Sequence, residues 1–389
     1  MPGLKSFHRV DGCLGNGTRS CVKLSSSTPP VGRNNLSAPI RHCLRTFLLA
    51  AGLFCGNVCP AKAETRLDVV EFSSRTLKNN PLHDPVVRRL AIFVPSQITN
   101  QTGLPVVYYL PGYGNSSDKF IEQGDQWRAF TQKLSDEGAP VLLVVVDGRN
   151  RWGGSQYLDS PAQGNYADYV CDEIASLVEA RYTMTTNKPQ RIIAGHSSGG
   201  FGALRLGMMR PKLFDGVIAL SPDSDFESSH LPLVRLPGVT NASLAQITSY
   251  MAAEMKSPLP KDGDLTYALG LSAAYASVGR SHPGQFEWLY DTQGRFREKI
   301  WQRWLDNDPL TRVQKNKHAF SASQSIYLEG AAQDQFGANV GARKIYEVIR
   351  HRETRCTFYE PPGGHGDHLQ ERLERGLAWV FHRPTKEIK

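Results

Sequence analysis

The stretch RIIAGHSSGGFGA, residues 191–203, carries the pattern that decides the fold of this chain. An apolar run of strand type leads into Gly195-His-Ser-Ser-Gly199, and the residues that follow, up to Met209, suit a helix. A G-x-S-x-G string between a strand and a helix is typical of a sharp turn that lifts a serine hydroxyl clear of a sheet. A Cβ at either flanking glycine would collide with neighbouring chain in such a turn. Ser197 is therefore a candidate nucleophile.

Two other interpretations of this stretch are weaker. G-x-S-x-G strings occur by chance in loops rich in Gly and Ser, but here the flanking residues have strand and helix patterns. A nucleotide-binding loop built on Gly200-Phe-Gly202 would need a third glycine. The helix after Ser197 also places unpaired N–H groups where they can stabilise an oxyanion. Both the setting and the chemistry favour a nucleophilic serine.

Strand-like segments alternate with helix-like segments on both sides of this turn. Beside the strand before Ser197, the predicted strands are 67–76, 89–94, 106–110, 140–146, 214–221, 325–329 and 355–359. The predicted helices are 122–137, 166–182, 201–209 and 369–381. Strands that are apolar throughout are typical of parallel strands buried on both faces. The pattern predicts an α/β-hydrolase fold, with a mainly parallel central sheet and helices on both faces.

The alternation stops between the predicted strands at 214–221 and 325–329. Residues 223–324 are therefore expected to form a lid-like insertion over the carboxyl edge of the sheet, with helices near 242–256 and 295–305. Its aromatic residues could line an acyl or aromatic pocket, although each on its own suits ordinary core packing: Trp288, Tyr290, Trp301 and Trp304. The chain is thus expected to hold one catalytic domain, 64–389, interrupted by this insertion.

Residues 1–63 have the features of a leader. A basic segment at 41–45 precedes an apolar run at 46–55 that is too short to span a bilayer, and Ala61-Lys-Ala63 is a small-x-small cleavage site. This pattern predicts a secretory signal peptide at about 41–63. An early start codon or a long basic region would account for residues 1–40. We expect an exported protein, periplasmic or secreted, without a stable membrane anchor.

Removal of the leader changes the charge and the cysteine count. Residues 1–63 contain eight of the 45 basic and one of the 37 acidic residues, so 37 basic and 36 acidic residues remain. A nearly neutral domain gives no support for nucleic-acid binding. Two of the seven cysteines, Cys171 and Cys356, lie outside the leader. They could pair in an oxidising compartment, although two separate thiols are the simpler expectation.

A nucleophilic serine needs a base, and the base needs an acid to orient it. In this fold the chain order is serine, acid, histidine. Asp334, after the strand at 325–329, is the preferred acid; Asp223 or Asp225 is the second choice and Glu329 the third. His365 is the preferred base, because the glycines before it let the loop turn towards Ser197, and His368 is the alternative.

The remaining site predictions concern an oxyanion and a metal. The N–H groups of Ser198 and of Tyr113, in the loop after the strand at 106–110, are the predicted oxyanion donors. The string His365-Gly-Asp-His368 suggests a zinc site, but its resemblance to an H-x-H-x-D-H string fails at Gly363 and leaves Ser197 unexplained. We therefore expect neither a metal nor a cofactor.

With these residues in place, the chain resembles the putative esterase family of α/β-hydrolases, which includes S-formylglutathione hydrolases, enterochelin esterases, feruloyl esterases and the mycolyltransferases of the antigen 85 group. The resemblance spans residues 67–381 and follows the segments NPLHDP (80–85), YLPGY (109–113), VDGR (146–149), GNYAD (164–168), GHSSG (195–199) and PGGH (362–365). It implies that Ser197, Asp334 and His365 form a catalytic triad. Two positions depart from the family: the Trp that often follows the histidine is missing, and Pro111 replaces a common His.

These features predict an exported serine carboxylic-ester hydrolase that acts on a small-molecule ester through an acyl-enzyme. One alternative is acyl transfer to an alcohol acceptor, because an acyl-enzyme can react with groups other than water. The other is a secreted, non-catalytic binding protein on a hydrolase scaffold. Product analysis with added alcohols separates the first two functions, and labelling with a fluorophosphonate separates both from the third. The sequence does not specify the ester or the oligomeric state.

Overall fold

The computed structural model describes residues 64–96, 103–182, 189–242, 245–248, 263–352 and 354–382. These residues belong to one compact unit, Ala63–Lys389. The predicted leader at 1–63 and most of the helix predicted near 242–256 lie outside the described residues. None of the helices in the described residues has the length and apolar composition needed to cross a bilayer.

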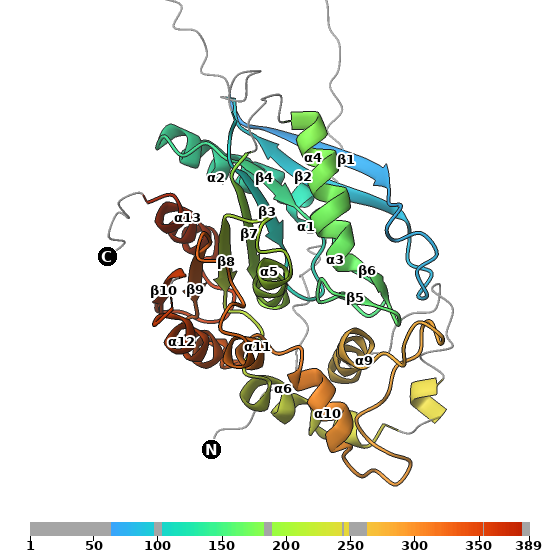
Figure 1. Cartoon of the computed structure of the whole chain (residues 1–389). Coiled ribbons are helices and arrows are strands. Elements are labelled where there is room, and N and C mark those ends of the chain that lie inside the picture. The colour runs from blue at the N-terminus through green and yellow to red at the C-terminus, as the bar shows by residue number, and fades with distance from the viewer. Residues whose placement is uncertain are drawn as a thin grey trace, which may run out of the picture. The chain divides into compact units, whose positions relative to one another are not determined.

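A central sheet organises the described chain (Figure 1). Its eight strands have the order β1-β2-β4-β3-β7-β8-β9-β10. They are β1 (Arg66–Ser73), β2 (Val87–Val94), β3 (Val106–Leu110), β4 (Leu142–Val145), β7 (Arg191–His196), β8 (Gly216–Leu220), β9 (Ser325–Glu329) and β10 (Arg355–Tyr359). β2 pairs antiparallel with β1 and β4, and the other pairs are parallel. The predicted mainly parallel sheet of the α/β-hydrolase fold is confirmed.

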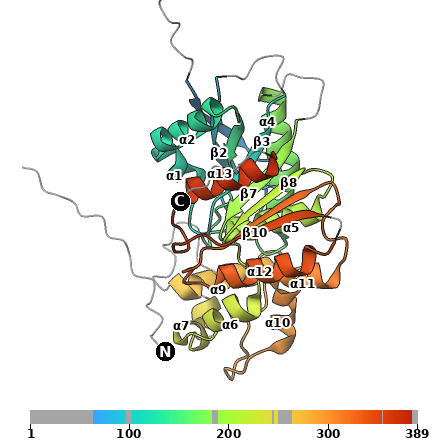
Figure 2. The ribbon, with the colours of Figure 1, turned by 90° about the vertical axis from the view of Figure 1, so that its left-hand side faces the viewer.

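Helices cover both faces of this sheet, as predicted (Figures 1 and 2). On one face lie α1 (Ser117–Glu122), α2 (Gly124–Asp136) and α13 (Leu369–Val380). On the other lie α3 (Tyr166–Asp168), the π-helix η1 (Tyr169–Ile174), α4 (Ala175–Tyr182), α5 (Ser198–Met209) and α12 (Ala338–Ile349). The helix predicted at 122–137 corresponds to α2, whereas α1, which precedes it and ends at Glu122, was not predicted.

The insertion between β8 and β9 is helical and has its own apolar core. It contains α6 (Phe226–Val234), α7 (Pro237–Thr240), α9 (Gly263–Tyr275), α10 (Glu298–Leu305) and α11 (Pro309–Lys315). Trp288, Trp301 and Trp304 are each at most 7% exposed, in line with ordinary packing. The sequence did not predict α9, because this helix is buried on nearly all sides and has no polar stripe. A short two-stranded sheet of β5 (Asp159–Ser160) and β6 (Gly164–Asn165) lies outside the insertion.

Cys171 and Cys356 are free thiols rather than a disulfide. Cys171 lies on η1 and is buried in the core, whereas Cys356 is partly buried on β10. Burial raises the pKa of the Cys171 thiol to about 12, so it stays protonated at neutral pH. Two separate thiols, the simpler expectation, are what the structure contains.

The turn between β7 and α5 is closely packed on β3. A Cβ on Gly199 would lie 1.8 Å from the carbonyl oxygen of Leu110, and one on Gly195 would lie 2.2 Å from the carbonyl oxygen of Gly199. Side-chain carbons do not approach backbone oxygens so closely in folded proteins, so both positions require glycine. The contact between α5 and β3 therefore fixes where the chain turns after His196.

We predict that Gly199→Ala destabilises the protein by roughly 3 kcal/mol, because the backbone of β3 or α5 must move to accept the methyl group. The free energy of unfolding in urea measures this effect. Gly263→Ala is the matched control, since a Cβ there meets no heavy atom within 4 Å. It should leave stability unchanged or raise it slightly. Equal urea midpoints for Gly199→Ala and the wild type would contradict the close packing.

Candidate active site

Ser197 occupies the turn between β7 and α5. Its backbone, with φ 58° and ψ −124°, lies in a region that serine rarely adopts. The Ser197 N–H donates to the carbonyl of Leu220 at 2.9 Å, and the Ser197 carbonyl accepts from the N–H of Phe201 at 2.9 Å. These bonds hold the strained residue between the ends of β7 and β8, while the serine stays partly exposed.

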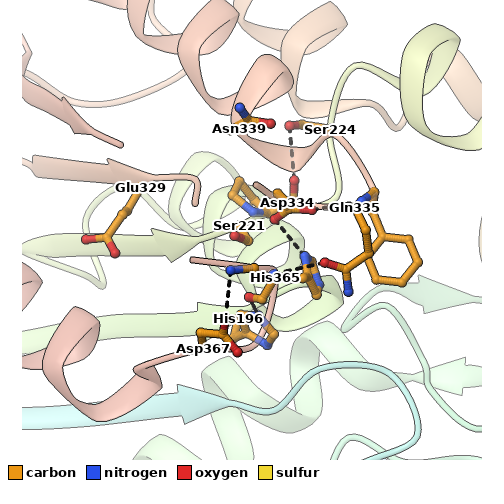
Figure 3. Close-up of polar contacts among 12 residues, drawn as sticks. His196, Ser221, Ser224, Glu329, Asp334, Gln335, Asn339, His365 and Asp367 are labelled. Atoms are coloured by element: carbon orange, nitrogen blue, oxygen red, sulfur yellow. Dashed lines mark hydrogen bonds and ion pairs between the residues drawn. The ribbon is translucent and has the colours of Figure 1, made fainter. Parts of the chain in front are cut away.

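His365 and Asp334 form a hydrogen-bonded pair. The Nδ1 atom of His365 lies 2.8 Å from Oδ2 of Asp334, whose side chain is inaccessible to solvent. Asp334 follows β9 and His365 follows β10, so adjacent parallel strands bring them together. Figure 3 shows this pair with Gln335, whose side-chain oxygen accepts from the His365 N–H at 3.1 Å. The predicted acid and base are therefore in direct contact.

The protonation of this pair follows from its surroundings. Burial acts to raise the pKa of Asp334, but the hydrogen bond and the charge of His365 outweigh it and hold the pKa below the ordinary value of 3.8. Asp334 is thus ionised at neutral pH. An ionised acceptor at Nδ1 fixes the N–H there and leaves Nε2 of His365 free to accept a proton.

The other predicted acids contact different partners. Glu329 is buried and pairs with Arg372 at 2.7 Å, and Figure 3 shows it apart from His365. Asp225 pairs with Lys344 at 2.6 Å. Asp223 lies beside Ser197 but makes no hydrogen bond to His365 among the described residues. Of the four candidates, Asp334 alone hydrogen-bonds the His365 imidazole.

His368, the alternative base, lies outside this cluster. Its side chain is 64% exposed, and its Nδ1 atom is 3.2 Å from Glu371 on α13. The backbone of His368 has φ 52° and serves as the residue before α13. The geometry therefore favours His365, the preferred base, over His368, the alternative.

The side chains of His196 and the buried Arg372 hold the backbone of His365. The carbonyl of His365 accepts hydrogen bonds from Nε2 of His196, at 2.7 Å, and from Arg372, at 2.9 Å. Burial and then the nearby His365 lower the pKa of His196 to about 3, so His196 is neutral and carries its proton on Nε2. Arg372 is 1% exposed and also donates to Ser221, at 2.8 Å. Neither His196 nor Arg372 belongs to a sequence pattern that would have predicted these contacts.

The serine and the imidazole are neighbours without a hydrogen bond between them in the described chain. The rings of His196 and His365 lie 4.6 Å apart, and His196 directly precedes Ser197. Ser197 and His365 both interact with the carboxyl of Asp223. Catalytic hydrogen bonds are often long in enzymes without substrate, so the arrangement is compatible with proton transfer.

The loop after β3 lies against the nucleophile. A Cβ on Gly112 would be 3.3 Å from Cβ of Ser197 and 3.3 Å from the carbonyl oxygen of His196. The N–H groups of Tyr113 and Ser198 make no hydrogen bonds to other described residues. Ser198 directly follows Ser197 and Tyr113 directly follows Gly112, so both predicted oxyanion donors belong to segments next to the proposed nucleophile.

Three segments that carry the family resemblance, 80–85, 146–149 and 164–168, contribute to a hydrogen-bond network next to the loop after β3. The hydroxyl of Tyr166 donates to Asp84 at 3.1 Å and accepts from Arg88 at 3.1 Å, and Arg88 pairs with Asp147 at 3.3 Å. The loop that starts at Asp147 leads to Tyr157, whose hydroxyl donates to the carbonyl of Pro111 at 2.7 Å. This buried network positions the oxyanion loop, which is a structural role.

A second acid lies on the serine side of the site. Asp223 follows β8, its N–H donates to the Ser197 carbonyl at 3.3 Å, and its Oδ2 accepts from the Tyr267 hydroxyl of α9 at 3.0 Å. Burial raises the pKa of Asp223 to about 6, although His365 and the hydroxyls of Tyr267 and Ser197 oppose the shift. The sequence marked Asp223 as a strand-end acid, but it held no signal for Tyr267.

The zinc interpretation has no geometric support in the described chain. No group of three or more His, Cys, Asp or Glu side chains there is arranged to hold a metal ion. Asp367, in the string that suggested zinc, instead accepts from the Gly364 N–H at 2.7 Å. That contact shapes the loop that carries His365.

Comparisons with known proteins agree with this fold. The profile of the family described as putative esterase matches residues 87–370. A solved ferulic acid esterase is 18% identical, with a TM-score of 0.54 over 82% of this chain and 98% of its own. FphF, a fluorophosphonate-binding serine hydrolase of Staphylococcus aureus, is 14% identical, with a TM-score of 0.52 over 82% and 99%. An S-formylglutathione hydrolase of Agrobacterium tumefaciens is 17% identical, with a TM-score of 0.50 over 82% and 96%. At these identities the structural likeness is one of fold.

The raised pKa of Asp223 predicts how its removal changes stability with pH. Between its unfolded value, near 3.8, and about 6, the folded state binds the proton more tightly, so the contribution of Asp223 to stability falls as the pH rises. At pH 7, Asp223→Asn should therefore be more stable than the wild type, by at most about 3 kcal/mol. This advantage should disappear as the pH falls to 4.

Urea unfolding at pH 4, 5, 6 and 7 measures this difference, with Asp306→Asn as the control. Asp306 is 52% exposed, and its pairing with Lys315 holds its pKa below the ordinary value. Its substitution should therefore not give a stability gain that grows from pH 4 to 7. A difference between Asp223→Asn and the wild type that does not change over this range would contradict the assignment of a raised pKa.

Proposed function

The chain belongs to the putative esterase family, and on that premise we propose that it is a serine carboxylic-ester hydrolase. Ser197 is the nucleophile, His365 the general base and Asp334 the acid that orients His365. The observation that carries the proposal is the buried Asp334–His365 hydrogen bond of 2.8 Å, next to a serine at φ 58° in a strand-to-helix turn.

The chemistry follows from these three groups. Nε2 of His365 accepts the proton of Ser197 as its oxygen attacks the ester carbonyl, and Asp334 stabilises the imidazolium that forms. The proton then passes to the leaving alcohol, and an acyl group remains on Ser197. Water, deprotonated by the same imidazole, attacks the acyl-enzyme and releases the acid. In the acylation of Ser197 and again in the hydrolysis of the acyl-enzyme, His365 acts first as base and then as acid.

Backbone N–H groups supply the electrostatic part of catalysis. The tetrahedral oxyanion would be bound by the N–H of Tyr113 and by that of Ser198 at the start of α5. The loss of one such donor in other serine hydrolases costs about 3 kcal/mol of transition-state stabilisation. The close approach of Gly112 to Ser197 supports the choice of the Tyr113 N–H as a donor, because Tyr113 directly follows Gly112.

We also propose that the protein is exported. The basic, apolar and small-x-small segments at 41–63 support this proposal. The two free cysteines of the catalytic domain lie on separate elements, so the domain does not need a disulfide to fold. The substrate is then a small-molecule ester available outside the cytoplasm.

Substitution of the proposed catalytic residues tests the mechanism. Ser197→Ala and His365→Ala should each lower kcat for p-nitrophenyl butyrate by at least about 10⁴-fold, because each removes a group that acts in the transition state. His368→Ala, which removes an exposed side chain, should stay within about twofold of the wild type. An active Ser197→Ala variant, or equal losses in the two histidine variants, would contradict the assignment.

Expression of the full chain in a Gram-negative host tests export. We expect the mature protein in the periplasm or the medium, with Glu64 as its first residue in N-terminal sequencing, because cleavage follows Ala63. A variant with charged residues in the apolar run, Leu48→Arg and Leu49→Arg, should stay in the cytoplasm and keep its leader. Cytoplasmic retention of the unaltered, uncleaved chain would contradict the proposal.

A further inference from the structure

Asp223 is fixed beside the nucleophile although the proposed triad is complete without it. Its backbone N–H donates to the Ser197 carbonyl at 3.3 Å, and its Oδ2 accepts from the Tyr267 hydroxyl at 3.0 Å. Its carboxyl also interacts with the Ser197 hydroxyl and with His365. The position of this carboxyl is thus set from the sheet on one side and from α9 on the other.

Asp223 differs from the other acids around the site in whether a cationic side chain pairs with it. Glu329 pairs with Arg372 at 2.7 Å, Asp225 with Lys344 at 2.6 Å, and Asp334 with His365 at 2.8 Å. Among the described residues, Asp223 forms no ion pair with a Lys or Arg. Burial without a cation disfavours its charged form, and a ligand that donates a hydrogen bond or brings a positive charge would relieve that cost.

The surroundings of Asp223 are aromatic and fixed. The rings of Tyr113 and Tyr267 meet edge to face with centroids 4.4 Å apart, and His230 lies 6.1 Å from the Tyr267 ring. The Tyr113 hydroxyl donates to the carbonyl of Trp152, which holds its ring in place. Aromatic faces next to a carboxylate are the groups that proteins use to bind ammonium ions.

These groups are accessible to a substrate. Ser197, Asp223, Tyr113 and Tyr267 are each partly exposed, in contrast to the fully buried strands behind them. Tyr267 lies on α9, and the other three residues lie in the segments that directly follow β3, β7 and β8. The carboxyl of Asp223 interacts with the Ser197 side chain, so it lies next to the place where an ester would be attacked.

The carboxylate of Asp223 raises the free energy of the transition state of the proposed reaction unless a substrate group offsets its negative charge. Ester attack creates a negative charge on the carbonyl oxygen, and a nearby carboxylate disfavours that charge. A positive or donating substrate group at Asp223 would remove this cost in the transition state. A carboxylate on the substrate at the same place would increase it.

We propose that Asp223, held by Tyr267, is a specificity site that selects esters with a hydrogen-bond donor, an ammonium or a hydroxyl group, close to the scissile carbonyl. The same site disfavours esters that carry a carboxylate there. This proposal rests on the proposed function of Ser197, because it concerns the substrate of that reaction. Asp223 acts here as a substrate-binding residue rather than as the base.

The test compares esters of matched size at pH 7.5 by automatic titration of the released acid. The acyl series is ethyl butyrate, ethyl 3-hydroxybutyrate, ethyl 3-aminobutyrate and monoethyl succinate. Butyl butyrate and 3-hydroxypropyl butyrate place the same change on the alcohol side. In at least one series, kcat/KM for the donor-bearing ester should exceed that of the neutral ester by about tenfold or more, since a site built for a donor rejects the analogue without one. Monoethyl succinate should be the poorest acyl substrate.

Variants of the site should change these ratios in a defined order. Asp223→Leu should remove the preference for the donor, because no acceptor remains. Asp223→Asn should keep a preference for hydroxyl but lose that for ammonium, since the amide oxygen accepts without charge. Tyr267→Phe should reduce the preference in part. Thermal unfolding of each variant checks that it is folded, and Asp306→Asn, an exposed acid of the insertion, should keep the wild-type ratios.

Equal kcat/KM values for donor-bearing and neutral esters in both series would overturn the inference. So would a preference that persists unchanged in Asp223→Leu. Both outcomes leave ester hydrolysis at Ser197 intact. Absence of turnover for every ester, or turnover that survives Ser197→Ala, would instead contradict the proposed function, so the two failures are distinguishable.

Discussion

The contact of two glycines with the carbonyl oxygen of Leu110 is the constraint on which the rest of the site depends. A Cβ on Gly199 would lie 1.8 Å from that oxygen and one on Gly195 would lie 2.9 Å from it. Because both residues lack a Cβ, α5 can start directly against β3, and the chain turns within one residue. Ser197 then takes φ 58°, and its N–H and carbonyl bond to the ends of neighbouring segments. A backbone held in this way fixes where the Ser197 hydroxyl lies before any substrate binds.

The order of the parallel strands brings residues that are far apart in the sequence into one site. Ser197, Asp223, Asp334 and His365 each follow the carboxyl end of one of four adjacent strands, β7, β8, β9 and β10. The buried Arg372 ties three of these segments together through Ser221, Glu329 and the carbonyl of His365. Loss of this arginine is expected to be costly, because it would remove the buried ion pair with Glu329 together with two further hydrogen bonds. His365, the proposed base, therefore lies on a loop whose backbone accepts hydrogen bonds from His196 and Arg372.

The sequence predicted those parts of the site that have a local signature. Ser197 lies in a five-residue motif between a strand and a helix, and Asp334 and His365 follow from the order of strand ends, so the sheet and the acid–base pair could be placed before the structure was known. Tyr267 could not, because it meets Asp223 across 44 residues of a segment without periodicity. In the sequence, Arg372 cannot be distinguished from the other polar residues of an amphipathic helix. Evidence that separates His365 from His368 comes from the structure, which gives the exposed fraction of each side chain and the acid that each contacts.

The central claim is that one strained serine carries the acyl group. Mass spectrometry of peptides from the folded protein after reaction with a fluorophosphonate tests it most directly, because this reagent traps only a serine activated by a base and an oxyanion site. We expect a single phosphonylated residue, Ser197, in the folded protein. Protein that is unfolded before the reagent is added should give no adduct. Modification of a different residue in the folded protein, or an unmodified Ser197 after full inactivation, would contradict it.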